Sequence, residues 1–163
     1  MLEISLFELA VRGVLEGFLF ILSVHALSRT RISTKPFIIS SLVIIAFTYL
    51  IRLLDINFGV HTVLNLIVII GLCVLFNKIA LFNAVKGAML TVLMMFAIEG
   101  INVGLLQLIY GEGLSKIIAD PYKKTLAGMP GLILFGVIVI TLYYFLAYRY
   151  SKNKTEEKNG ETS

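Results

Sequence analysis

The chain has 163 residues, of which 58% are hydrophobic and only 15% charged, and its formal net charge is +4. A soluble domain carries about 25% charged residues, so this composition excludes an ordinary soluble protein and predicts an all-α integral membrane protein. The basic residues lie near the ends of apolar stretches, where membrane topology explains them, and nucleic-acid binding is not expected.

Five apolar stretches follow one another along the chain. A helix needs roughly 17–25 residues to cross the hydrocarbon core of a bilayer, and all five stretches meet this requirement. Helix is the predicted structure for each, because an open strand edge cannot exist in lipid. The predicted transmembrane domain covers residues 1–148, with spans at 5–27, 37–54, 60–76, 84–109 and 130–148.

The basic residues are distributed unevenly between the connections. The segments on one side of the membrane hold Arg29, Arg31, Lys35, Lys78, Lys86, Arg149, Lys152, Lys154 and Lys158. The other side holds only Lys116, Lys123 and Lys124, which are offset by Glu112 and Asp120. Because basic loops stay in the cytoplasm, we expect the N-terminus outside, the C-terminus inside, and the protein in the bacterial cytoplasmic membrane.

The connection before the last span contains its own signals. Asp120-Pro121 is typical of a helix N-cap followed by proline at the first helical position, and Gly128 is a stop signal. We therefore predict one or two short amphipathic helices over 111–128, lying on the outer surface. The tail, 149–163, is polar and is predicted to be disordered in the cytoplasm.

Polar residues inside the spans are the candidate functional residues. A charged side chain at mid-membrane costs about 2.5–3.5 kcal/mol, so such residues usually pair or face a cavity. Helix periodicity places Arg12 and Glu16 on one face of the first span. Six residues from four spans are expected to lie toward the outer side, namely Arg12, Glu16, Arg52, His61, Glu99 and Asn102.

Two interpretations of this cluster remain open. The first is an outward-facing pocket for a small ligand or ion, and the second is a salt-bridge network that only locks the helices together. Two small-residue motifs lie beside the acids, Gly13-xxx-Gly17 and Gly100-xxx-Gly104. Such motifs let helices approach closely, which favours packing within the chain, with homodimerisation as the alternative.

An enzyme is not expected. His61 and Cys73 are typical residues of membrane cysteine peptidases, but twelve positions along one helix separate them by about 18 Å and about 120°. The sequence has no paired metal-ligand motif, serine elbow or phosphate-binding glycine loop, so no catalytic residue, metal or cofactor is predicted. His25 is interpreted as an interfacial residue.

Several short runs together resemble a known family. The runs are Arg12-Gly-Val-Leu-Glu16-Gly, Ile51-Arg52-Leu, Phe58-Gly-Val-His61-Thr62, Ile118-Ala-Asp120-Pro121 and Gly128-Met-Pro130. They resemble the five-span membrane region that precedes the kinase in Firmicutes sensor histidine kinases of the sporulation-phosphotransferase or GHKL type. The resemblance covers residues 1–148 and implies a signal-receiving role for Arg12, Glu16, Arg52 and His61.

The chain departs from that family after the last span. His61 is its last histidine, so we expect no phosphoacceptor histidine after the membrane region. Only a short polar tail follows Arg149, so we expect no ATP-binding module either. We therefore expect a non-enzymatic sensor or regulatory module that lies in the lipid bilayer and signals through a partner protein. The alternative is a substrate-binding subunit of a small-molecule transporter, although such subunits usually have six spans.

Overall fold

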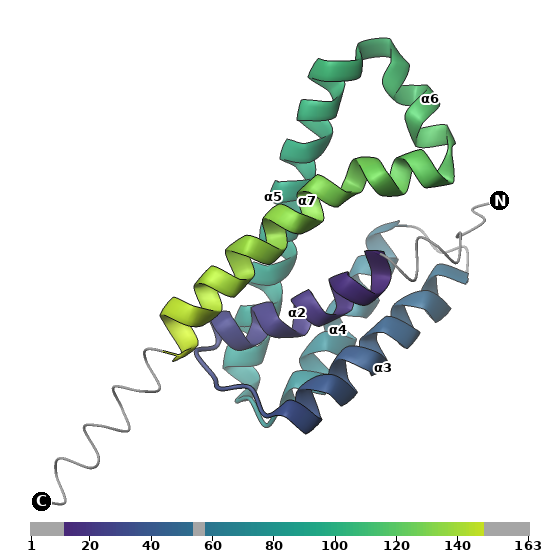
Figure 1. Ribbon diagram of the computed structural model, residues 1–163. Helices are drawn as coiled ribbons and strands as arrows, with labels where there is room; N and C mark the ends of the chain where they lie inside the picture. The colour runs from purple at the N-terminus through teal and green to yellow at the C-terminus, as the bar shows by residue number, and fades with distance from the viewer. Residues whose placement is uncertain (1–11, 54–57, 149–163) are drawn as a thin grey trace, which may run out of the picture.

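The computed structural model describes residues 12–53 and 58–148, and all the regular structure in these residues is helical, which confirms the all-α prediction. The main helices are α2 (Val14–Leu27), α3 (Thr34–Leu53), α4 (Phe58–Leu75), α5 (Leu81–Tyr110) and α7 (Pro121–Leu142). Three shorter elements complete the order, η2 (Gly111–Gly113), α6 (Leu114–Ala119) and the π-helical η3 (Tyr143–Tyr148). In Figure 1, α6 bridges the ends of α5 and α7 where these two helices diverge.

Three of the described helical segments are long and apolar enough to cross a membrane. They lie in α3 (Thr34–Ile51), in α5 (Leu81–Tyr110) and in α7 continued into η3 (Tyr122–Leu146). The described parts of α2 and α4 are also apolar but shorter, with apolar segments at Val14–Leu27 and Val60–Leu75. Large apolar side chains such as Ile67 and Leu93 are exposed on the outer faces of these helices, as expected where lipid is the solvent.

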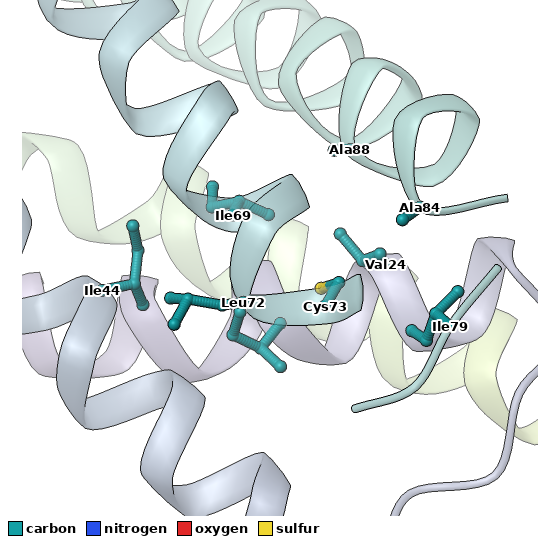
Figure 2. Packing of buried hydrophobic residues seen from close by; sticks show 9 residues of the cluster. Val24, Ile44, Ile69, Leu72, Cys73, Ile79, Ala84 and Ala88 are labelled. Carbon is teal, nitrogen blue, oxygen red and sulfur yellow. The ribbon is translucent and has the colours of Figure 1, made fainter. Parts of the chain in front are cut away.

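Helix α2 lies at the centre of the fold and packs against α3, α4, α5 and α7. Its residues Ile21 and Val24 are fully buried. They belong to a core cluster with Ile44, Ile69, Leu72, Cys73, Ile79, Ala84 and Ala88, which Figure 2 shows. A second cluster joins α5 to α7 through Met95, Ile98, Leu132, Phe135 and Val139, with Leu19, Phe20 and Leu22 of α2 packed against it.

Glycines allow the central helix to approach its neighbours closely. A Cβ atom on Gly17 would overlap the Ile45 side chain of α3, so this glycine brings α2 and α3 together. On α5, a Cβ atom on Gly87 would stand 2.8 Å from Oγ of Ser28 and 3.2 Å from the Val24 carbonyl oxygen. The packing role predicted for Gly17 is therefore seen between α2 and α3, whereas the tight contact at Gly87 was not predicted.

The ends of several helices meet at one end of the bundle. His25 of α2 hydrogen-bonds with Asn77, which follows α4, at 3.2 Å. The Ser28 hydroxyl donates to the Asn83 carbonyl at the start of α5 at 2.9 Å. The Ile32 amide donates to the Tyr143 hydroxyl at 3.3 Å. The connections after α2 and after α4 therefore lie beside each other, and the end of α7 lies next to them.

Helix α7 confirms one boundary prediction and corrects another. Asp120 is its N-cap, because a carboxylate oxygen accepts from the amides of Tyr122 and Lys123 at 3.0 and 3.4 Å, and Pro121 is its first residue. Gly128 does not stop the helix, which continues through Pro130 to Leu142. The prediction that a short helix ends at Gly128 and a separate span begins at Pro130 was wrong. Packing in a bundle overrides the low helix propensity of glycine and proline.

The other boundaries differ from the predicted spans by a few residues. Helix α3 begins at Thr34 and α5 begins at Leu81, each three residues before its predicted span. The predictions for residues 1–11, for the turn at 54–57 and for the tail at 149–163 lie outside the described residues.

Candidate functional site

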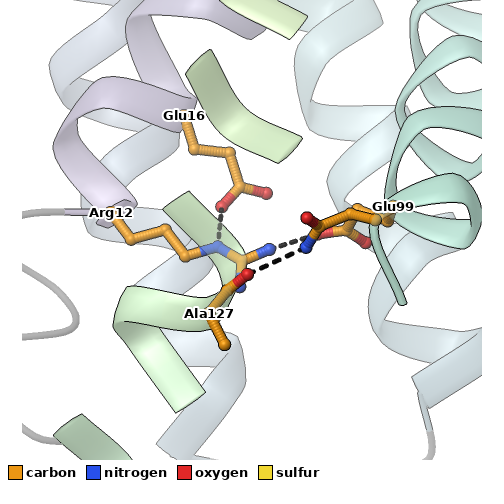
Figure 3. Close-up of polar contacts among 5 residues, drawn as sticks. Arg12, Glu16, Glu99 and Ala127 are labelled. Atoms are coloured by element: carbon orange, nitrogen blue, oxygen red, sulfur yellow. Dashed lines mark hydrogen bonds and ion pairs between the residues drawn. The ribbon is translucent and has the colours of Figure 1, made fainter. Parts of the chain in front are cut away.

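Three charged residues of the predicted cluster meet in the structure. The guanidinium of Arg12, in the helical turn that leads into α2, forms an ion pair and hydrogen bond with Glu99 of α5. The same guanidinium lies 3.8 Å from a carboxylate oxygen of Glu16, one turn along its own helix. Figure 3 shows Arg12 between the two carboxylates. One cation thus links the central helix to α5.

The cluster is only partly accessible to solvent. The side chains of Arg12 and Glu16 are each 16% exposed, and that of Glu99 is 34% exposed. Removing charges from water is costly, so each of these groups depends on its charged partners. Glu99 is the most accessible member of the cluster.

Helix α7 forms the third side of the site. Gly128 faces Arg12, because a Cβ atom there would stand only 2.6 Å from Nη1 of the guanidinium. Asn102 lies three residues after Glu99 on α5. Its side-chain amide donates to the Ala127 carbonyl at 2.9 Å. A Cβ atom on Gly131 would lie 3.2 Å from Cβ of Asn102. The site residues of α2 and α5 therefore contact one short stretch of α7.

That stretch, residues 127–131, is the weak stretch of α7, because its residues support a helical backbone least well. Pro130 has no amide hydrogen, so the helix loses the bond that would end at the Leu126 carbonyl. Gly128 and Gly131 flank the proline, and each glycine weakens a helix by about 1 kcal/mol relative to alanine. The polar site therefore lies where α7 bends most easily, and Asn102 adds a hydrogen bond from outside the helix.

His61 belongs to a polar group between α3 and α4. Its Nδ1 hydrogen-bonds with Nδ2 of Asn65 at 3.2 Å, one turn along α4. The hydroxyl of Thr48, on α3, donates to Oδ1 of the same asparagine at 3.0 Å. Asn65 and Thr48 were not predicted as site residues. The side chain of Arg52, also predicted for this site, lies outside the described residues.

Packing within the chain, the first of the two predicted roles of Gly100 and Gly104, is not seen in the described residues. A Cβ atom on either glycine would meet no heavy atom within 4 Å, so neither packs against the described part of the chain. The reason is helix geometry. Asn102 faces α7, and positions two residues away are rotated by about 200°, which places both glycines on the opposite side of α5. Gly13, the first residue of the other motif, immediately precedes α2 and is half-buried.

Cys73 and His61 occupy one continuous helix. Cys73 is fully buried in the core cluster near the C-terminal end of α4, whereas His61 lies in the first turn of the helix. The rise of twelve helical residues, about 18 Å, keeps the thiol and the imidazole apart. The arrangement does not form a cysteine–histidine catalytic pair.

A buried polar group at the other end of α2 was missed. His25, which was interpreted as interfacial, is 1% exposed. Its imidazole contacts Thr30 at 3.0 Å and Asn77 at 3.2 Å, and Asn77 donates to Ser40 of α3 at 2.7 Å. The signal in the sequence was that polar residues follow the first and third spans at the same predicted side of the membrane.

Comparisons of the chain with protein-family models, with curated proteins and with solved structures found no match. The resemblance to the membrane region of sensor histidine kinases therefore stays a prediction, and the function is argued from the site itself.

Proposed function

We propose that the protein is a non-enzymatic membrane sensor or regulatory module. It binds a small ligand or ion at the Arg12–Glu16–Glu99 cluster and signals through a partner protein. The chain crosses the membrane five times, with α2 and α4 as the additional spans, and the cluster opens toward the outer face.

The arrangement of the helices supports this topology. Helix α2 is enclosed by α3, α4, α5 and α7, so it shares the bilayer with neighbours that are long enough to span it. The basic connections after α2 and after α4 lie at one end of the bundle, with the end of α7 beside them. Basic segments stay in the cytoplasm, which places Asp120 and the start of α7 outside.

The observation that carries the proposal is that the ion-paired cluster contacts the weak stretch of α7. Charged residues within a membrane bundle are costly and mark a functional site by default. A charged ligand would compete with one of the ion pairs of Arg12 and change its contact with Gly128. Such a ligand shifts the bend of α7 only to the extent that it binds one arrangement more tightly than the other.

The output is proposed to pass along α7. This helix connects the cluster to the opposite end of the bundle, where Tyr143 contacts the connection after α2. A change in the bend at Gly128–Gly131 moves that end and the basic connections beside it. A membrane or cytoplasmic protein docked there receives the signal, and the module itself has no catalytic turnover.

Native mass spectrometry of the detergent-purified full chain tests the proposal. We expect a small molecule or ion to remain bound, and the identified compound, added back, to raise the midpoint of thermal unfolding. Glu99→Gln and Glu16→Gln should abolish this shift, while Lys123→Gln, at an exposed lysine outside the cluster, should keep it. A shift of equal size in all three variants would contradict the assignment of the site.

A further inference from the structure

Two connections form one surface at the end of the bundle opposite α6. The first, residues 28–33, joins α2 to α3, and the second, residues 76–80, joins α4 to α5. The His25–Asn77 and Ser28–Asn83 hydrogen bonds, at 3.2 and 2.9 Å, hold the two connections together. They and the adjoining helix turns are called the two-loop surface below.

The two-loop surface is strongly cationic. It carries five exposed basic residues, Arg29, Arg31, Lys35, Lys78 and Lys86. No acidic residue occurs in the sequence between Glu16 and Asp55, or between Asp55 and Glu99, so neither connection contains a carboxylate. All the charged residues in these segments are therefore basic, and they attract anions.

Two of these cations occupy unusual backbone positions. Arg29 and Lys78 both have φ of 53°, in the left-handed region that normally favours glycine. Arg29 lies two residues after Leu27, the last residue of α2, and Lys78 lies three residues after Leu75, the last residue of α4. Left-handed residues commonly follow the end of a helix in this way. A basic side chain therefore occupies the left-handed backbone position of each connection, although glycine would fit the backbone with less strain.

Large apolar side chains adjoin the cations. Leu75 is 75% exposed, Leu81 is 62% exposed and Phe82 is 78% exposed, and all three flank the second connection. Cations directly beside exposed apolar groups match a phospholipid, which offers a phosphate to the first and acyl chains to the second. In the proposed bilayer-spanning arrangement these apolar groups lie against lipid, so a lipid headgroup is the anion beside the cations.

We infer that the two-loop surface binds the phosphate headgroup of an anionic phospholipid, with Arg29 and Lys78 as its main contacts. The inference rests on the proposed topology for the side it faces, which is the inner leaflet. It assigns a second binding site, separate from the Arg12 cluster, at the end of the bundle where the proposed signal leaves.

Native mass spectrometry of the full chain with equal amounts of phosphatidylglycerol and phosphatidylcholine, matched in acyl chains, tests the inference. We expect preferential binding of phosphatidylglycerol. Each basic residue near an anionic lipid contributes about fivefold in affinity, so the Arg29→Gly, Lys78→Gly double variant should bind it about 25-fold more weakly. Glycine suits the left-handed backbone at both positions, so this variant should stay folded.

Three further variants and one competitor make the test decisive. The double variant Arg29→Lys, Lys78→Arg keeps both charges and should retain the lipid. The double variant Lys123→Gln, Lys124→Gln, at the start of α7, should retain it too. Glu99→Gln should bind phosphatidylglycerol normally, which separates this inference from the proposed ligand site. Millimolar inorganic phosphate should not displace the lipid. Displacement by phosphate, or equal binding of both lipids, would overturn the inference. Equal binding of both lipids would favour an acidic protein as the partner of this surface.

Discussion

The guanidinium of Arg12, in the turn that leads into α2, lies against Gly128 on α7, where a Cβ atom would stand 2.6 Å from Nη1. Gly128 has no side chain with which to bind a charge, yet its missing side chain leaves the space that Arg12 occupies while it pairs with Glu99. The glycine is therefore part of the polar site, and its replacement should affect the ion pairs directly.

We expect Gly128→Ala to lower the free energy of unfolding by about 1–3 kcal/mol, because the new methyl group overlaps the guanidinium and Arg12 must give up its geometry with Glu99. Thermal unfolding of the detergent-purified protein measures this. The matched control is Gly104→Ala, which meets nothing within 4 Å and should be neutral or stabilising by up to about 1 kcal/mol. Equal midpoints for the two variants would refute the role of Gly128.

The Arg12–Glu99 ion pair should be detectable as a coupling energy. Arg12→Ala and Glu99→Ala should each lower the free energy of unfolding. The expected loss lies between about 1 kcal/mol, the value for an exposed ion pair, and about 3–5 kcal/mol, the value for a buried one. The double variant should recover part of the loss. A double-mutant cycle on thermal or chemical unfolding measures it, and strictly additive losses would show that the residues are not partners. Lys123→Ala breaks an exposed ion pair with Asp120 and should cost little.

The start of α7 should depend on the Asp120 cap. Asp120→Ala removes the acceptor for the Tyr122 and Lys123 amides and should cost about 1 kcal/mol. Asp120→Asn retains a capping oxygen and should keep most of the stability, although it also loses the ion pair with Lys123. Hydrogen exchange at the amides of Tyr122 and Lys123 locates the effect. Unchanged exchange in the alanine variant would argue against the cap.

The buried contact between His25 and Asn77 should stabilise the end of the bundle. Asn77→Ala leaves the imidazole and the Ser40 hydroxyl without this partner in the core, which should cost about 1–3 kcal/mol. Ser40→Ala should cost less, because it removes only one of the contacts of Asn77. Thermal unfolding in detergent measures both, and a larger loss for Ser40→Ala would contradict the central place of Asn77.

The proposed topology predicts which residues a membrane-impermeant thiol reagent reaches. Cys73 is the single cysteine and is buried, so Cys73→Ser provides a cysteine-free background. In that background Lys123→Cys should be labelled in intact cells, because this exposed side chain lies on the proposed outer side. Lys78→Cys should be labelled only after lysis. The reverse pattern would invert the orientation.

The sequence alone determined the helical nature of the chain and the cap of its last helix. Both features depend on residues that are close together in the sequence. Apolar runs of spanning length can satisfy their backbone in lipid only as helices, and Asp120-Pro121 binds and orients the amides directly after it. Helix periodicity also placed Arg12 and Glu16 on one face, where the structure has them.

Only the tertiary structure decided which faces meet. Periodicity defines a face but not its rotation toward a neighbour, so it did not show that Asn102 turns toward α7 while Gly100 and Gly104 turn away. Gly128 was interpreted as a helix stop because propensity is local. Packing against Arg12, 116 positions earlier in the chain, explains why a glycine occupies that position inside a continuous helix.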